Sequence, residues 1–212
     1  MIADFAALPL AQKRLLLLLV ALLLAAQIAQ PYPEVALLQH LPTILLLICA
    51  PRLLRRWPLW TASVACIMLF LALHTLGGRY AYSNVPYDDW AQALMNATVS
   101  EAFGWTRNHY DRLVHFAFGA LSVVPVLEVA RRWGGLNGRG AALAALGWVL
   151  GISCLYEIFE WLLTIAAAGE TADRYNGQQG DIWDAQKDMA LAALGAMTVL
   201  ALRSRIAISR RA

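Results

Sequence analysis

The chain has 212 residues, of which 60% are hydrophobic and 15% are charged. About a quarter of the residues of a soluble domain are charged, and here the apolar residues form long uninterrupted blocks, so the composition excludes an ordinary soluble protein. The formal net charge of +3 is small, and no nucleic-acid partner is expected. The three cysteines, Cys49, Cys66 and Cys154, lack metal-type spacing and are interpreted as small buried apolar side chains.

Six apolar blocks are long enough to cross a bilayer as helices, for which about 20 residues are needed. They cover residues 12–29, 35–51, 58–77, 110–132, 140–167 and 184–204. No small-residue cleavage site follows the first block, which is interpreted as a retained helix. The second is short and interrupted by Pro42, and the fifth carries two glutamates. We therefore expect an all-α membrane helix bundle, a single integral membrane domain over residues 1–212.

The Lys and Arg residues at the helix ends predict the orientation of the bundle. Twelve of the 17 lie at the ends that the alternation of spans assigns to the cytoplasm, together with both termini. They are Lys13, Arg14, Arg52, Arg55, Arg56, Arg131, Arg132, Arg139, Arg203, Arg205, Arg210 and Arg211. The opposite ends are predicted to face the periplasm of a bacterial inner membrane. Twelve of the 14 acidic residues lie on that side; since acids contribute little to orientation, we expect a functional site there.

The two long connections on the predicted periplasmic side cover residues 78–109 and 168–183. In the first, Trp90, Ala93, Leu94 and Ala97 recur at helical spacing, with polar residues between them. This pattern predicts an amphipathic helix lying in the membrane interface. A plain ordered loop is the alternative.

Polar residues gather at the predicted periplasmic ends of four spans, in segments 74–82, 107–115, 156–161 and 180–188. A helix rises about 1.5 Å per residue, so His74, His115 and Asp188 each lie roughly 9 Å outward from the middle of their spans. Glu157 and Glu160 lie at a similar depth. Ionisable groups are costly in hydrocarbon unless they are paired or face protein or water. We therefore expect these groups to meet inside the bundle.

Spacings of three or four residues place ionisable residues on shared helix faces. The pairs are Asp111 with His115, Glu157 with Glu160, and Asp184 with Asp188. Histidine with carboxylates and no thiolate suits a divalent metal such as zinc, manganese or iron. The candidate metal ligands are His74, His115, Glu157, Glu160, Asp184 and Asp188. The candidate catalytic residues are Asp111, His115, Glu157, Glu160, Asp184 and Asp188.

Three further residues are candidates for binding a substrate: Arg107, Tyr80 and Tyr156. Arg107, like Arg112, would hold an anionic headgroup. Two alternatives stay open for the whole cluster. In the first, the cluster binds a ligand or ion without catalysing a reaction. In the second, it is a structural network in which Asp111 pairs with Arg112 or Arg107 and His115 forms a hydrogen bond with a glutamate.

These segments resemble the YjdF-like family of small bacterial inner-membrane proteins, over most of the chain from about Leu41 onward. The matching residues are His74-Thr75 with Gly77, Arg107 to Arg112 with His115-Phe116, Tyr156-Glu157 with Glu160-Trp161, and Gln179-Gly180-Asp181 with Trp183-Asp184, Gln186 and Asp188-Met189. That family is of uncertain function, so the resemblance implies a membrane protein but no activity. A more distant similarity is to VanZ-like proteins, through an Asp-Lys-x-x-His pattern in which this sequence has Arg112 in place of the usual Lys between Asp111 and His115. It implies envelope lipids or polymers.

From these patterns we expect a cell-envelope enzyme that acts on a membrane lipid or a lipid-linked substrate at the periplasmic face, by metal-assisted hydrolysis or transfer. A protein that binds or transports a small ligand or ion is the main alternative, and a structural partner of an envelope complex is another. The inner halves of the spans hold almost no ionisable residues, which favours a one-sided cavity over proton-coupled transport. The sequence names no protein partner.

Overall fold

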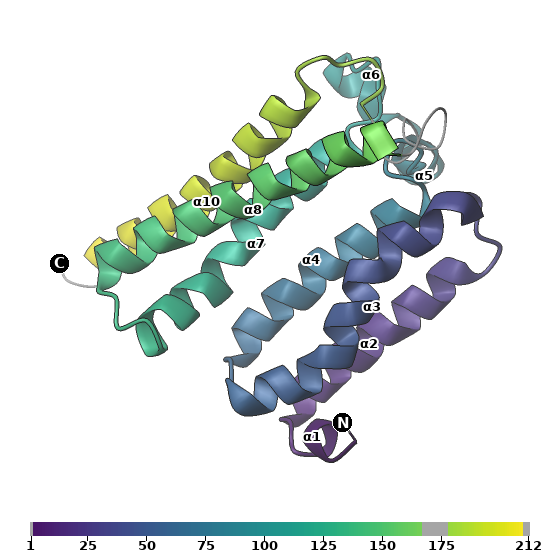
Figure 1. Cartoon of the computed structure of the whole chain (residues 1–212). Coiled ribbons are helices and arrows are strands. Elements are labelled where there is room, and N and C mark those ends of the chain that lie inside the picture. The colour runs from purple at the N-terminus through teal and green to yellow at the C-terminus, as the bar shows by residue number, and fades with distance from the viewer. Residues whose placement is uncertain (1, 167–177, 210–212) are drawn as a thin grey trace.

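The computed structural model describes residues 2–166 and 178–209, which form nine helices and no strand (Figure 1). They are α1 (Ile2–Ala6), α2 (Leu10–Gln27), α3 (Pro33–Arg56), α4 (Thr61–Arg79), α5 (Tyr87–Met95), α6 (Val99–Phe103), α7 (Tyr110–Arg132), α8 (Gly138–Ala166) and α10 (Asp184–Ser209). Residue 167 of the predicted fifth span and residues 168–177 of the following connection lie outside the described residues.

Six of the described helices, α2, α3, α4, α7, α8 and α10, are long and apolar enough to cross a membrane. The expected all-α bundle of six spans is therefore confirmed. The prediction for the second span is wrong in its length and continuity: α3 has 24 residues and runs through both Pro42 and Pro51. Spanning helices tolerate proline because neighbouring groups satisfy the backbone that it leaves unpaired.

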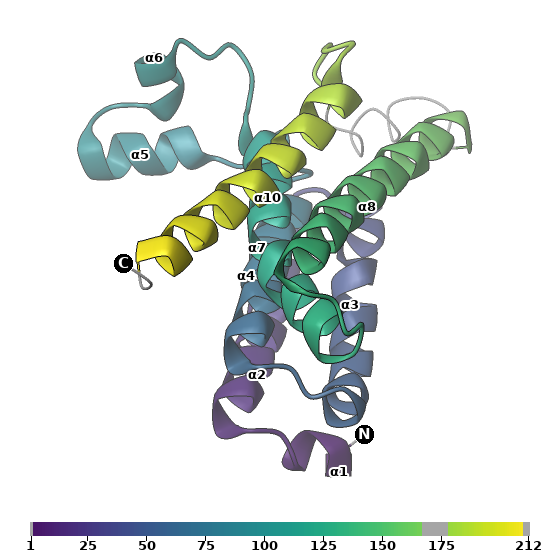
Figure 2. The same ribbon diagram turned by 90° about the vertical axis from the view of Figure 1, so that its left-hand side faces the viewer.

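The spans form two groups of three, α2 with α3 and α4, and α7 with α8 and α10 (Figures 1 and 2). Packing of α4 against α7 joins the groups, so α7 contacts three other spans. One apolar core lies among α2, α3 and α4, around Leu16, Leu54 and Met68. The other lies among α7, α8 and α10, around Val123 and Val149. The outer sides of the helices expose apolar residues, as expected in lipid; Cys49 and Cys154 are exposed there, so their predicted burial is wrong.

The connection between α4 and α7 carries α5 and α6, which lie at one end of the bundle (Figure 1). We refer to it as the α5–α6 end. Helix α5 forms where an amphipathic helix was predicted, and Trp90 and Leu94 on its apolar face are exposed. An exposed apolar face on a short helix beside a membrane domain fits the headgroup interface.

At the opposite end, Glu128 of α7 fixes the start of α4. Its carboxylate accepts hydrogen bonds from the backbone N–H of Trp60 at 2.8 Å and from the Ser63 hydroxyl at 2.6 Å, and it pairs with Arg132. A carboxylate at a helix N-terminus satisfies N–H groups that have no partner within the helix. This contact holds α4 and α7 together far from the polar cluster at the other end.

Candidate functional site

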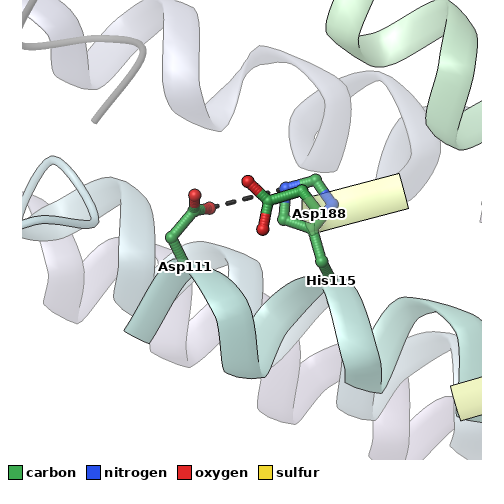
Figure 3. Close-up of side chains that lie close together, drawn as sticks. All are labelled: Asp111, His115 and Asp188. Atoms are coloured by element: carbon green, nitrogen blue, oxygen red, sulfur yellow. Dashed lines mark ion pairs between the residues drawn. The ribbon is translucent and has the colours of Figure 1, made fainter. Parts of the chain in front are cut away.

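The polar cluster forms where the first turns of α7 and α10 lie side by side near the α5–α6 end. Asp111 and His115 lie one turn apart on α7, and Asp188 faces them from α10 (Figure 3). Each of the three offers a donor atom within 4.8 Å of the others. All three residues are buried.

His115 is the centre of this group. Its Nε2 atom lies 3.5 Å from Asp111 Oδ1 and 3.8 Å from Glu157 Oε1 of α8. The imidazole packs edge-on against the Tyr156 ring, with 6.0 Å between the ring centroids. One ring nitrogen is thus shared between carboxylates from two helices.

A stripe of small and apolar residues on α8 positions Glu157. The buried residues of this helix are Ala141, Ala145, Val149, Ser153 and Glu157, each four positions after the last. Side chains four apart lie on one helix face. The face that packs against α7 and α10 therefore ends in the carboxylate that approaches His115.

Two carboxylate oxygens of this cluster lack hydrogen-bond partners among the described residues: Asp188 Oδ1 and Glu157 Oε1. Asp188 is 2% exposed and Glu157 9% exposed. A buried polar oxygen without a hydrogen-bond partner is costly and needs an explanation such as an ion. These two oxygens are the part of the cluster that its own residues leave unsatisfied.

Arg112 joins the start of α10 to α7 through its buried guanidinium. Its Nη2 atom lies 2.5 Å from Asp184 Oδ1 and 3.0 Å from Asp181 Oδ2, and Nη1 lies 2.5 Å from Asp188 Oδ2. Nη1 also donates to the backbone oxygen of Asp184 at 3.0 Å. A guanidinium has five donors in a fixed plane and suits such multiple pairing.

Arg107 extends this network to the chain before α10. Its Nη1 atom donates to Asp184 Oδ1 at 3.0 Å and to the backbone oxygen of Gln178 at 3.0 Å. Beside it, Asn108 and Gln179 exchange two hydrogen bonds of 3.0 Å. The residues before α7 and those before α10 are therefore held together as a polar clamp.

Charges around the clamp shift two titratable groups that lie outside the spans. Lys187 Nζ donates to Asp181 Oδ2 at 2.6 Å and lowers the pKa of this carboxyl below its ordinary value of 3.8. Partial burial, with Arg107 nearby, lowers the pKa of His109, whose ring stacks on Trp105 with 4.3 Å between centroids. Asp181 is thus held ionised and His109 neutral near pH 7.

A cavity of about 250 Å³ adjoins the cluster. It is lined by Pro42, Phe70, Leu71, His74, Tyr82, Asp111, Val114, His115, Phe118, Ile152, Ser153 and Tyr156, from α3, α4, α7, α8 and the turn after α4. Most of these side chains are apolar. Asp111 and His115 therefore stand both in the ionic cluster and at the wall of an apolar space.

His74 of α4 also lines the cavity. Its Nε2 atom is 2.7 Å from the backbone oxygen of Gln39, and its Nδ1 bonds the Tyr82 hydroxyl. Tyr82 and Ala81 both have positive φ, 52° and 47°, which is uncommon for residues other than glycine and costs free energy. The Tyr82 ring packs on Gly77, where a Cβ would lie 2.8 Å from it. The strained turn after α4 thus directs Tyr82 to His74.

The structure brings together some of the predicted site residues and separates others. Asp111, His115, Glu157 and Asp188 meet at one place, whereas Asp184 pairs with arginines. Glu160 lies half-buried on α8, and both ring nitrogens of His74 are engaged away from the group formed by Asp111, His115 and Asp188.

The predicted substrate-binding residues are also divided. Tyr156 lines the cavity, but Arg107 is engaged by carboxylates, and Tyr80 packs edge-on against Trp90 of α5. Sequence reasoning missed Tyr82 and Ser153 as cavity residues. The four-residue spacing from Ser153 to Glu157 could have predicted that Ser153 shares a helix face with Glu157. The position of Tyr82 depends on a turn that no sequence pattern indicates.

Comparisons with known proteins give a family but no activity. The family described as "Predicted membrane protein (DUF2238)" matches residues 11–208. The chain is 36% identical over 154 residues to a protein of Escherichia coli (strain K12) named "Inner membrane protein YjdF", an alignment that covers 71% of this chain and 68% of that protein. No solved structure matches the chain.

Proposed function

This chain belongs to the DUF2238 family of predicted membrane proteins, and we propose that it is a membrane enzyme acting on a lipid or lipid-linked substrate. Its buried Asp111, His115 and Asp188 would bind a divalent metal, with Glu157 beside them as the base. The family resemblance seen in the sequence is confirmed. With its six apolar helices, the chain is a multi-pass inner-membrane protein. The similarity to VanZ-like proteins stays a prediction.

The observation that carries the proposal is the pair of buried oxygens without hydrogen bonds among the described residues, Asp188 Oδ1 and Glu157 Oε1, beside His115. Asp111, His115 and Asp188 form a set of two carboxylates and one imidazole, which suits zinc, manganese or iron, and Glu157 lies beside this set. Asp188 would present one oxygen to the metal while Arg112 holds the other, at 2.5 Å. An outer partner of this kind orients a metal ligand.

A metal in this cluster supports hydrolysis or group transfer, because it lowers the pKa of a bound water and polarises an ester or phosphoester oxygen. The residues of the chain supply the rest of the chemistry. Glu157 stands beside His115 and is placed to accept a proton from the attacking water. Asp184 and Arg112 hold α10 against α7 and so keep Asp188 in place.

The choice of a lipid substrate follows from the cavity. Asp111 and His115 lie at the wall of a largely apolar space within the spans, and such a space does not stabilise a water-soluble polar metabolite. The orientation predicted by the positive residues places this end of the bundle at the periplasm. We therefore assign the reaction to a lipid or lipid-linked molecule of the cell envelope.

Elemental mass spectrometry of the purified full-length protein tests the proposal. We expect stoichiometric zinc, manganese or iron in the unmodified protein, and its loss in His115→Ala and Asp188→Asn. The control is Asp89→Asn, which removes an exposed acid of α5 and should leave the metal unchanged. Hydrolysis of radiolabelled envelope lipids, lost in Glu157→Gln with the metal retained, would assign the catalytic role. Absence of metal from folded protein after incubation with all three ions would overturn the metal site.

A further inference from the structure

The cavity beside His115 has packed helix interfaces on only three of its four sides. Its walls come from α3, α4, α7 and α8, and the pairs α3–α4, α4–α7 and α7–α8 pack against each other. Helices α3 and α8 are not among the closely packed pairs of the described chain. At the α5–α6 end, Leu163 of α8 packs against the cluster of Val35 and Ala81, so the gap between the two helices lies deeper, beside Pro42 and Ile152. The lining residues at these two edges, Pro42 of α3 and Ile152 of α8, are both exposed. The open side of the cavity therefore lies between α3 and α8, where the bundle faces the hydrocarbon of the bilayer.

The lining is graded in polarity along the membrane normal. On α7, Asp111 lies toward the α5–α6 end and Phe118 about 10 Å deeper, at 1.5 Å per residue. On α4, His74 lies toward that end and Phe70 one turn deeper. On α8 the order is again the same, with Tyr156 above Ile152. Three separate helices thus place polar groups at the α5–α6 end of the cavity and apolar groups toward the middle of the membrane.

This gradient matches the shape of one kind of molecule. A lipid in the leaflet at the α5–α6 end has its polar head at that end and its hydrocarbon chain pointing to the midplane. A mainly apolar cavity stays dry rather than filling with water, so a hydrocarbon chain is the occupant that the lining suits. The volume of about 250 Å³ is close to the lower limit of small-ligand pockets, about 300 Å³, and holds part of one chain.

We infer that this cavity binds a hydrocarbon chain of a membrane lipid, which enters sideways between α3 and α8 and brings the first polar group of the lipid to Asp111 and His115. The inference deepens the function proposed above and rests on it for the identity of the reacting group. A phospholipid acyl chain and the isoprenoid chain of a polyprenyl phosphate share this chemistry.

The polar end of the cavity must supply the selectivity. Transfer of a chain from bilayer to cavity gains little from the hydrophobic effect, because lipid tails are as apolar as the lining. Hydrogen bonds to the head of the lipid discriminate more strongly. Asp111 and His115 line this end of the cavity and are the polar groups that the head of the lipid would meet.

Photolabelling of the full-length protein in lipid nanodiscs tests the inference. The probe is a phosphatidylglycerol with a photoreactive diazirine in one acyl chain, present at trace level, and labelled residues are mapped by mass spectrometry. We expect labels on cavity residues, with Phe70, Phe118 and Ile152 labelled above the lipid-facing surface. Labels spread evenly over exposed apolar residues, with none in the cavity, would overturn the proposal.

A matched pair of variants on α8 sharpens the test. Ile152→Trp adds bulk at the edge of the cavity and should reduce the labelling of Phe70 and Phe118 several-fold. Leu155→Trp adds the same bulk at an exposed position, 61% exposed, that does not line the cavity, and should leave it unchanged. Equal labelling in both variants, each with an unchanged melting temperature, would also overturn the proposal. The map in the unmodified protein decides the matter if Ile152→Trp does not fold.

Competition distinguishes the two sources of the chain. Unlabelled polyprenyl phosphate that displaces the probe from the cavity would identify a lipid carrier, and displacement by phosphatidylglycerol alone would identify a phospholipid. The labelling requires neither metal nor turnover. Cavity labelling in a protein that binds no metal would therefore contradict the proposed metal-dependent enzyme and support the binding site for a hydrocarbon chain. Turnover of a lipid without cavity labelling would support the enzyme and contradict the binding site.

Discussion

Gly119 of α7 and Ala192 of α10 lie back to back, so that a Cβ on Gly119 would fall 1.8 Å from the carbonyl oxygen of Ala192. The contact is reciprocal: a Cβ on Gly195 of α10 would fall 2.1 Å from the carbonyl oxygen of Phe116. Small residues let spanning helices approach to backbone contact. One turn before Ala192, this approach places Asp188 beside His115.

Gly119→Ala should destabilise the protein, because the added methyl group requires α7 and α10 to separate. Overpacking costs about 1–3 kcal/mol and sometimes more, and the metal site should weaken with it as Asp188 moves away. Thermal unfolding in detergent, followed by far-UV circular dichroism, measures the effect. Gly147→Ala on α8 is the control, since a Cβ there meets nothing within 4 Å. Equal melting temperatures for the two variants would contradict the tight crossing.

The spans were predictable because each depends on local composition alone. The predicted range 110–132 coincides with α7, since Asp111 and Arg132 bracket one apolar run. The crossing at Gly119 was not predictable, because nothing in the periodicity of either helix says which faces meet. The end of α3 was missed because Pro51 and Arg52 resemble a helix stop, yet the helix continues past the hydrocarbon to Arg56.

Arg112→Ala should be among the most destabilising single changes. It leaves the buried carboxylates of Asp184 and Asp188 without the guanidinium that now lies 2.5 Å from each, and breaking a buried ion pair costs about 3–5 kcal/mol. Arg112→Lys should recover only part of this, because an ammonium cannot form the same planar set of bonds.

The control for Arg112 is Arg55→Ala, which removes an ion pair with Asp4 from a side chain that is 58% exposed. Such surface pairs contribute about 0–1 kcal/mol. Chemical denaturation in mixed micelles compares the three variants. A loss for Arg112→Ala no larger than for Arg55→Ala would show that the network contributes little to stability.

Several of the candidate residues lie together in the structure, but the sequence was less informative about which atoms face each other. Depth arithmetic placed His74, His115, Glu157, Glu160 and Asp188 at similar levels, and of these His115, Glu157 and Asp188 lie together, with Asp111 one turn from His115. The four-residue spacing of Asp184 and Asp188 could not show that Asp184 pairs with Arg107 and Arg112 instead of joining this group. Distances between helices depend on packing, which a single sequence does not contain.

The orientation predicted from the positive residues has a direct test. In a variant whose native cysteines are replaced by alanine, Asn84→Cys in the turn before α5 should react with a membrane-impermeant maleimide added to intact cells. Leu136→Cys, in the exposed turn between α7 and α8, should react only after the cells are opened. The reverse pattern would place the α5–α6 end in the cytoplasm and would move the proposed reaction to that side.

The last prediction concerns pH and the clamp at the start of α10. Lys187 lowers the pKa of Asp181 below 3.8, so the carboxylate stabilises the folded state above the pKa that it has in the unfolded chain. The contribution is lost as pH falls through the lower, folded-state pKa. Asp181→Asn should therefore melt below the unmodified protein at pH 7, and the difference should shrink once the pH falls below 3.8.

Asp89→Asn, an exposed change on α5, should show no comparable difference at pH 7. A difference between Asp181→Asn and the unmodified protein that persists unchanged well below 3.8 would mean that the neutral side chain, and not the carboxylate charge, stabilises the clamp through Trp183, whose backbone N–H donates to Asp181 Oδ1 at 3.1 Å.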